Sequence, residues 1–344
     1  MKKFLVLFLF VLISSCSNNY TNFHENISNF SQNKQISQEK INDFSLKDLR
    51  KFENIEIAST PDKNLIKKLR EKIKNAKSRI YIEMYIFTEK DLRKELINAK
   101  KRGIDIQVIL EKNVYMASNL NKQTFDDFSK SGIKVTWASS ENFALTHTKL
   151  MIIDDEIIIS TANYSYSSFS KNREFFLFIK DNILLKHLLS IFEADFLQKK
   201  EIIYDSNLVL SPYYTRNKFE ILLKSAKKSI KMYIQNFDDE EILNILKQKK
   251  EDGIDIELIL PDLKSLARNK EEIEKLDKYK IKYKLLKSPY IHAKSILIDD
   301  EYLYLGSINM SYYSIEKNRE IGVILKEENI IKNFKEIFIN DFQK

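Results

Sequence analysis

The sequence predicts an α/β protein made of two copies of one lobe, each a mixed β-sheet flanked by helices. Three observations lead to this fold class. Segments with helical apolar spacing alternate with β-branched and aromatic runs. GIDIQVIL at 103–110 returns as GIDIELIL at 253–260, with six of eight positions identical. Further motifs return at similar offsets, which indicates a duplicated domain because solenoid units are only about 20–50 residues long.

The elements of the first copy set the pattern, and we place the two lobes at residues 53–200 and 201–344. We expect helices at 65–77, 92–102 and 118–131 and strands at 79–87, 104–110 and 133–137. The second copy repeats the order with helices at 219–229 and 240–252 and strands at 230–237 and 254–260. Gly103, Gly132 and Gly253 stand just past three of these helices, where glycine is the usual terminator.

The first residues have the layout of an export signal. MKK is a basic start, and the ten apolar residues 4–13 are too few to span a membrane. Cys16, the only cysteine, ends the segment ISSC, which resembles the lipobox of bacterial lipoproteins. The resemblance implies a signal peptide at 1–15 and lipidation of Cys16. It therefore predicts an exported protein anchored to the outer or the cytoplasmic membrane, facing away from the cytoplasm.

Composition and charge restrict the partners only loosely. Residues 16–52 are rich in Ser, Asn, Gln and Lys and predict a disordered tether. The net charge is +8, or +6 once Lys2 and Lys3 leave with the signal peptide. This charge favours anionic partners such as lipid headgroups or nucleic acid, without choosing between them.

The candidate site is a motif that occurs twice. The spacing H-x-K-x-x-x-x-D is formed by His147, Lys149 and Asp154 and again by His292, Lys294 and Asp299. The intervening residues are apolar, so we expect each motif on a buried strand with its His and Lys on one face. One copy alone would be equally well explained by a core histidine beside a lysine. Two copies at matching repeat positions favour a site, and we interpret His24 and His187 as incidental.

Each motif is followed by further polar residues that suit attack on a phosphodiester. These are Asn163 in STAN, Ser307 and Asn309 in GSIN, and Glu174 and Glu320 in two KNRE segments. One imidazole can form a phosphohistidine while the other protonates the leaving oxygen. The lysines, the asparagines and Ser307 can donate hydrogen bonds to phosphoryl oxygens, and the glutamates are candidates to fix the histidine tautomers. Without HExxH, CxxC, a dense carboxylate cluster or a Gly-rich phosphate loop, we predict an enzyme that needs neither metal nor cofactor.

The doubled motif, with its later asparagine and glutamate, resembles the phospholipase D superfamily over about residues 53–344. The resemblance implies two lobes related by a pseudo-two-fold axis, with one active site in the cleft between them. It implies that one histidine is the nucleophile, assigned to His147 by the usual order in the family, and that His292 is the general acid. It also implies a structural role for Asp154 and Asp299. Because both half-sites lie in one chain, we expect a monomer.

The first copy departs from the pattern. STAN has Ser160 where GSIN has Gly306, and it follows its motif aspartate one residue sooner. We expect a β-bulge to absorb the difference in length. We also expect the missing glycine to hinder close approach of the backbone to phosphate, which puts Asn163 in doubt.

The resemblance leaves several activities open. Headgroup hydrolysis of phospholipids, as by phospholipase D, is our first expectation, because a lipid anchor holds the enzyme where lipid is concentrated. The alternatives are an endonuclease, a phosphatidyltransferase similar to cardiolipin synthases, and an inactive protein that binds anionic lipid or nucleic acid. Cardiolipin synthases of this family usually carry N-terminal membrane spans, which residues 4–13 are too short to provide.

Overall fold

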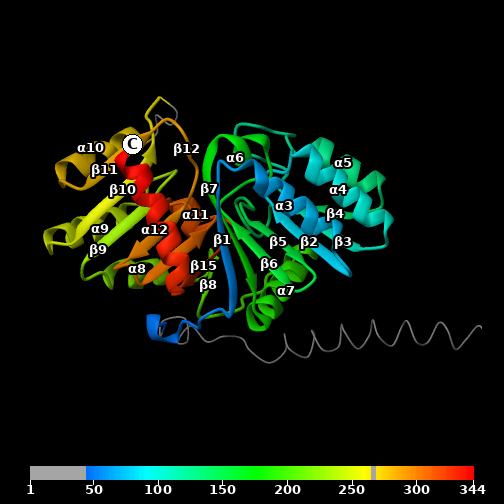
Figure 1. Cartoon of the computed structure of the whole chain (residues 1–344), viewed down its shortest axis with the longest axis horizontal. Coiled ribbons are helices and arrows are strands. Elements are labelled where there is room, and N and C mark those ends of the chain that lie inside the picture. Colours follow the sequence, from blue (N-terminus) through cyan, green and yellow to red (C-terminus); the bar gives the residue numbers. More distant parts are fainter. Residues whose placement is uncertain (1–43, 265–268) are drawn as a thin grey trace, which may run out of the picture. The chain divides into compact units, whose positions relative to one another are not determined.

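The computed structural model describes residues 44–264 and 269–344 (Figure 1). The predicted signal peptide, Cys16 and the tether up to residue 43 lie outside these residues. Two β-sheets form the body, and each carries its own hydrophobic core under flanking helices. The predicted fold class is therefore confirmed.

The first lobe is built around a sheet with the strand order β1-β7-β6-β5-β2-β3-β4. The eighth strand of this sheet is β12 from the second lobe, which pairs with β7. Its strands are β1 Asn54–Thr60, β2 Arg79–Met84, β3 Asp105–Leu110, β4 Lys134–Trp137, β5 Lys149–Ile153, β6 Glu156–Ser160 and β7 Asn172–Lys180. Its helices are α3 Lys63–Lys74, α4 Lys90–Lys101, α5 Lys122–Lys130, α6 Tyr166–Ser170 and α7 Asn182–Phe196, preceded by the 3-10 turn η1 Leu46–Asp48.

The second lobe repeats this topology in the order β8-β15-β14-β13-β9-β10-β11. Its strands are β8 Leu208–Ser211, β9 Ser229–Tyr233, β10 Asp255–Pro261, β11 Lys282–Leu286, β12 Tyr290–Ile291, β13 Ser295–Ile298, β14 Tyr302–Gly306 and β15 Glu320–Leu325. Its helices are α8 Thr215–Lys224, α9 Glu240–Glu251, α10 Lys270–Lys278, α11 Tyr312–Glu316 and α12 Glu328–Gln343. In both sheets the parallel strands follow crossover helices, and the antiparallel pairs β5–β6 and β13–β14 are hairpins with short turns.

The predicted helix ends are found near their glycines. Gly103 and Gly253 follow α4 and α9 with φ of 92° and 84°, a left-handed conformation that glycine adopts without strain. The chain then turns directly into β3 and β10, the repeated GIDI strands.

The difference between STAN and GSIN has a cause other than the one expected. The extra residue lies in the hairpin turn: Ile153 pairs with Glu156, whereas Ile298 pairs with Tyr302. The two turns are therefore two and three residues long, and the expected β-bulge is wrong. A Cβ atom on Gly306 would lie 2.4 Å from Gly322 and 2.8 Å from the Tyr304 hydroxyl. This glycine is therefore required for close packing against Gly322 and Tyr304, a reason other than the expected approach of the backbone to phosphate.

Residues 44–52 differ from the tether that composition predicts up to residue 52. Three apolar side chains in this segment are buried, those of Phe44, Leu49 and Phe52. Phe44 and Leu49 belong to the core of the second lobe. The segment thus runs along the second lobe before β1 enters the first sheet.

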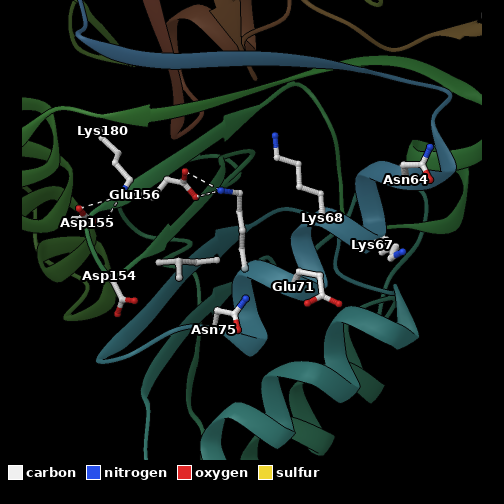
Figure 2. Close-up of a pocket in the computed structure, with 11 residues that line it drawn as sticks. Asn64, Lys67, Lys68, Glu71, Asn75, Asp154, Asp155, Glu156 and Lys180 are labelled. Carbon is white, nitrogen blue, oxygen red and sulfur yellow. Dashed lines mark hydrogen bonds and ion pairs between the residues drawn. The ribbon is translucent and has the colours of Figure 1, made fainter.

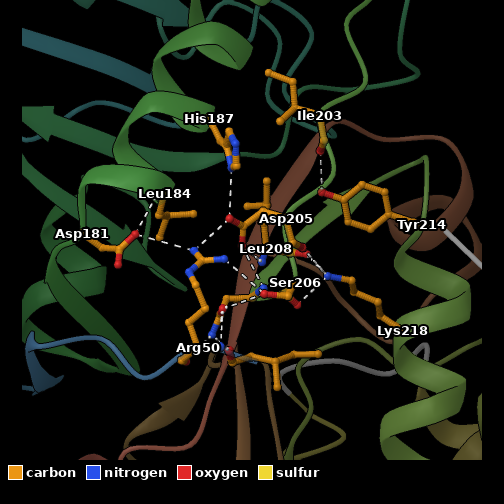
Figure 3. Close-up of polar contacts among 12 residues, drawn as sticks. Arg50, Asp181, Leu184, His187, Ile203, Asp205, Ser206, Leu208, Tyr214 and Lys218 are labelled. Atoms are coloured by element: carbon orange, nitrogen blue, oxygen red, sulfur yellow. Dashed lines mark hydrogen bonds and ion pairs between the residues drawn. The ribbon is translucent and has the colours of Figure 1, made fainter. Parts of the chain in front are cut away.

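A polar cluster fixes this segment to the connection between the lobes (Figure 3). The carboxylate of Asp205 accepts hydrogen bonds from Arg50 at 2.9 Å and faces His187 at 3.0 Å. The ammonium of Lys218 is fully buried and donates to three carbonyl oxygens, while burial lowers its pKa to about 7. His187, interpreted as incidental to the site, therefore has a partner in the lobe connection.

The motif aspartates follow the ends of β5 and β13, away from the histidines. Asp154 accepts hydrogen bonds from the backbone N–H groups of Lys77, Ser78 and Arg79 at 2.9, 2.8 and 3.2 Å. Asp299 accepts from Lys227, Lys228 and Ser229 at 2.8, 2.7 and 2.8 Å. Each carboxylate thus ties the turn that precedes the first parallel strand of its lobe to the motif hairpin.

Replacing Asp299 should destabilise the fold more than replacing its neighbour. Asp299→Ala loses three charge-assisted hydrogen bonds, whereas Asp300→Ala loses an exposed ion pair to Lys335. Both positions have positive φ, 54° and 58°, so the backbone strain added by alanine is matched. We expect Asp299→Ala to lower the free energy of unfolding by about 2–4 kcal/mol relative to Asp300→Ala in urea titrations. Equal stability of the two variants would contradict this role.

Candidate active site

The two histidines are positioned by strand segments that leave their own sheets. His147 lies just before β5, and His292 lies between β12 and β13. The backbone N–H of His147 donates to the carbonyl of Arg319, and that of His292 to the carbonyl of Arg173. The sequence predicted that each motif lies on a buried strand, whereas both histidines precede the strands β5 and β13. These residues pair with the opposite lobe, which brings both motifs to the lobe boundary.

Each histidine is held by a glutamate of the other lobe. The Nδ1 atom of His147 lies 2.8 Å from a carboxylate oxygen of Glu320. The Nδ1 atom of His292 lies 2.8 Å from Glu174. All four side chains are nearly or fully buried, and the glutamates are completely so. With Nδ1 donating to a carboxylate, Nε2 is the nitrogen left to act on a substrate in both lobes.

The lysines differ between the half-sites. The Nζ atom of Lys149 lies 3.1 Å from Nε2 of His147 and donates to the His147 carbonyl at 2.9 Å. The Nζ atom of Lys294 donates to the carbonyl of His292 at 2.5 Å and to Oε1 of Gln235 at 2.6 Å. In the first lobe the ring of Tyr85 occupies the place of Gln235, 5.3 Å from Nζ of Lys149. The two half-sites therefore share their core residues but not their surroundings.

Besides burial, the charge of each motif lysine acts on the motif histidine of the other lobe and lowers its pKa. Burial, and next the charge of Lys294, hold the pKa of Lys149 well below its usual value. Burial lowers the pKa of His147 and of His292 to about 4, while the facing glutamates act in the opposite direction. The ammonium groups repel each other in a region of low dielectric, so an anion bound between them would relieve this repulsion.

The remaining candidates divide into two groups. Asn163 and Asn309 are buried, and the amide oxygen of each has no hydrogen-bond partner. An amide oxygen accepts hydrogen bonds, so a hydroxyl group of a ligand would satisfy it, whereas an unprotonated phosphodiester oxygen would not. Ser307 is placed differently from its predicted role, because its hydroxyl is fully buried and both accepts from and donates to the backbone of Ile321. Its counterpart Thr161 donates to Glu174 at 2.6 Å.

Two arginine clamps fasten the lobes beside the site. Arg173 forms two hydrogen bonds with Asp341 of α12, at 2.6 and 2.9 Å. Arg319, completely buried, forms the equivalent pair with Asp195 of α7, at 2.7 and 2.9 Å. Burial, and next the charge of Asp195, raise the pKa of the neighbouring Glu83 well above its usual value. The clamps are bidentate and shielded from water, which fixes the backbone that carries the two glutamates.

Sequence reasoning missed several of these supporting residues. The KNRE repeat held the signal for the arginine clamps and for Asn172 and Asn318, whose amides donate to Glu174 and Glu320 at 3.2 Å. Tyr85 and Gln235 gave no signal, because the two repeats differ at this position.

A surface depression elsewhere does not compete with this site. It is lined by α3 and by the β5–β6 turn, at the end of β5 opposite His147 (Figure 2). Its charged groups neutralise each other, as in the ion pairs Lys72–Glu156 and Lys180–Asp155. Within residues 44–264 and 269–344, no group of three or more His, Cys, Asp or Glu side chains is arranged to hold a metal ion.

The sequence matches the family described as "Cardiolipin synthase, PLD-like domain" over residues 69–196 and 220–342, one match in each lobe. The chain belongs to this phospholipase D-like family. "Cardiolipin synthase 1" of Staphylococcus aureus (strain MRSA252) is 26% identical over 324 residues, which cover 79% of this chain and 64% of that protein. The chain thus spans less than two thirds of the length of this relative. "Phospholipase D" of Rickettsia prowazekii is 26% identical over 170 residues, 49% of this chain and 80% of that protein.

Solved structures support the same fold. Phosphatidylserine synthase of Haemophilus influenzae matches with a TM-score of 0.67 at 15% identity, over 89% of this chain and 90% of that chain. Polyphosphate kinase of Porphyromonas gingivalis matches with a TM-score of 0.63 at 15% identity, over 83% and 50%. At this identity both show the fold alone. In the described part of the chain no helix is long and apolar enough to cross a bilayer.

The crossed pairing makes a prediction about histidine tautomers. Glu320→Gln should alter the imidazole ¹⁵N signals of His147 and leave those of His292 in place, because the amide cannot hold Nδ1–H as a carboxylate does. Glu174→Gln should do the reverse. We expect each variant to lower turnover by on the order of 10²–10⁴-fold. Perturbation of the histidine in the same lobe as the substituted glutamate would contradict the crossed arrangement.

Proposed function

We propose that the protein is a phosphatidyltransferase, which moves a phosphatidyl group from one phospholipid to the hydroxyl group of another lipid. The observation that carries the proposal is the pair of buried imidazoles, each held at Nδ1 by a carboxylate of the opposite lobe and each accompanied by its motif lysine. This arrangement suits one phosphodiester anion. The phospholipid substrate and the transfer reaction are favoured by the relatives named cardiolipin synthase.

The proposed reaction has two balanced steps. In the first, Nε2 of His147 attacks phosphorus, a P–N bond forms and the P–O bond to the leaving alcohol breaks. Nε2–H of His292 gives its proton to the leaving oxygen. In the second step the acceptor hydroxyl gives its proton back to His292, its oxygen attacks phosphorus and the P–N bond breaks. Lys149 and Lys294 stabilise the charge that builds on the phosphoryl oxygens.

The histidine pKa values fit this sequence. With an empty site the pKa of each imidazole is about 4, so both are neutral near pH 7 and His147 is ready to attack. As the general acid, His292 must be doubly protonated. The negative charge of a bound phosphodiester raises the pKa of its imidazole and so favours this form. The substrate thus helps to set the protonation state that its own cleavage needs.

Hydrolysis of the phospholipid headgroup is the second candidate. It uses the same phosphohistidine, with water in place of the acceptor alcohol. The relative named phospholipase D favours it, but this relative matches only 49% of the chain. Water and the acceptor alcohol compete for the same phosphohistidine, and the faster of the two reactions determines whether the product is that of hydrolysis or of transfer.

A substrate panel in EDTA tests the proposal. With phosphatidylglycerol vesicles we expect a lipid with two phosphatidyl groups and free glycerol, in the absence of divalent metal. His292→Ala should abolish the reaction, whereas His187→Gln, outside the site, should retain it if the fold is intact. Phosphatidic acid as the main product would favour hydrolysis instead. Cleavage of plasmid DNA without any change in lipid would overturn both lipid reactions.

We also propose that the mature chain is attached to a membrane through a lipidated Cys16, on the evidence of the ISSC segment. Cys16→Ser should move the protein from the membrane fraction to the soluble fraction after cell breakage, because a single amino-acid change removes the attachment site for the acyl chains. Mass spectrometry of the N-terminal peptide supplies an independent check. An unmodified Cys16 in membrane-bound protein would refute the anchor.

A further inference from the structure

Exposed apolar side chains gather in segments that border the candidate site. The described residues include ten large apolar or aromatic side chains that are exposed, and six of these lie in three such segments. We call these six the apolar rim: Tyr115, Met116, Leu120, Tyr166, Tyr312 and Tyr313. A random scatter over the surface would not concentrate them next to the site residues.

Two of the segments are α6 and α11, which occupy equivalent places in the two lobes. Tyr166 follows Asn163 by three residues, and Tyr312 follows Asn309 by the same interval. The carbonyls of Lys171 and Lys317, just after α6 and α11, accept hydrogen bonds from the backbone N–H groups of Tyr290 and Ala144, in the segments that lead to the opposite histidines. Each helix therefore begins within three residues of a site asparagine and ends beside the segment that leads to the opposite histidine.

The third segment is the loop after β3. The backbone N–H of Tyr115 donates to the hydroxyl of Tyr85 at 2.8 Å, and the Tyr85 ring packs edge-on against His147 with centroids 4.6 Å apart. The next residue, Met116, is 91% exposed and has a φ of 56°, which is uncommon for a residue other than glycine. The Met116 side chain therefore contributes nothing to the core and is available to contact another molecule.

Positive charge accompanies the rim. Lys112, Lys171 and Lys317 are exposed and form no ion pair with any described residue. Nζ of Lys171 lies 5.8 Å from the ring centroid of Tyr166, and Nζ of Lys317 lies 5.7 Å from that of Tyr312. Tyrosine with lysine is the combination found where proteins meet the headgroup region of an anionic bilayer.

We propose that the apolar rim inserts into the surface of an anionic bilayer and holds the active site against the headgroups. This inference rests on the proposed phospholipid substrate. Met116 and Leu120 favour lipid over single-stranded nucleic acid, because an aliphatic side chain inserts among acyl chains but offers no ring for base stacking. The rim thus adds a second contact with the membrane, next to the chemistry and separate from Cys16.

Environment-sensitive fluorescence at single cysteines tests the proposal on the full chain. In a Cys16→Ser background, Met116→Cys and Tyr313→Cys carry the dye, with Ile183→Cys as the control on α7. Ile183 is 49% exposed and follows the end of β7 remote from Glu174. With phosphatidylglycerol-containing vesicles we expect a blue shift and higher emission at positions 116 and 313 and no change at 183. No response at 116 and 313, or an equal response at 183, would overturn the proposal.

The same probes test whether the lysines beside the apolar rim contribute to binding and whether the partner is a bilayer or a nucleic acid. Lys171→Glu and Lys317→Glu should each weaken vesicle binding at least about fivefold, since one basic residue near the surface contributes about 1 kcal/mol. Vesicles of phosphatidylcholine alone should give a smaller response. A response to a single-stranded oligonucleotide, without one to vesicles, would overturn the membrane assignment. The probes report insertion without turnover, so failure of the transfer reaction would leave this result intact.

Discussion

The crossed pairing of imidazole and carboxylate is the interaction on which the site depends. Each lobe supplies a histidine that it cannot orient by itself and a glutamate that orients the histidine of the other lobe. The backbone exchange of β12 with β7, and of the segment before His147 with Arg319, makes this pairing part of the fold. The segments that join the two lobes are consequently the same segments that carry the histidines, so a shift between the lobes would also move the imidazole–carboxylate pairs.

The second constraint is the buried positive charge. The side chains of Lys149 and Lys294 are buried, and the charge of Lys294 lowers the pKa of Lys149. The two nearby glutamates are paired with the histidines. An anion bound next to both lysines would relieve the repulsion between them, which favours an anionic ligand over a neutral one. The bidentate arginine clamps join the two lobes beside the site through Asp341 and Asp195.

The sequence allowed the fold to be predicted, and the doubled motif named the histidines, lysines and glutamates that the structure brings together. It could not show that Glu174 serves His292, since within one repeat Glu174 follows His147 and suggests a pair inside the lobe. Gly306 illustrates another limit: a glycine near a phosphate motif suggests close backbone approach, and only the packing of Tyr304 shows why it is there. The predicted tether extended too far, to residue 52, because the three buried side chains of residues 44–52 are too widely spaced to make the composition of this segment look apolar.

The pseudo-two-fold exchange also suggests how such a chain arose. A single lobe would hold a histidine without its carboxylate, and two identical lobes packed about a true two-fold axis would restore both pairs. In such a homodimer the two imidazoles are identical by sequence and cannot be specialised. Fusion into one polypeptide removes that restriction, and the half-sites have since diverged at Tyr85 against Gln235 and at Glu83 against Tyr233. Joining the two lobes in one chain thus allows the two copies of the motif histidine to lie in different chemical environments.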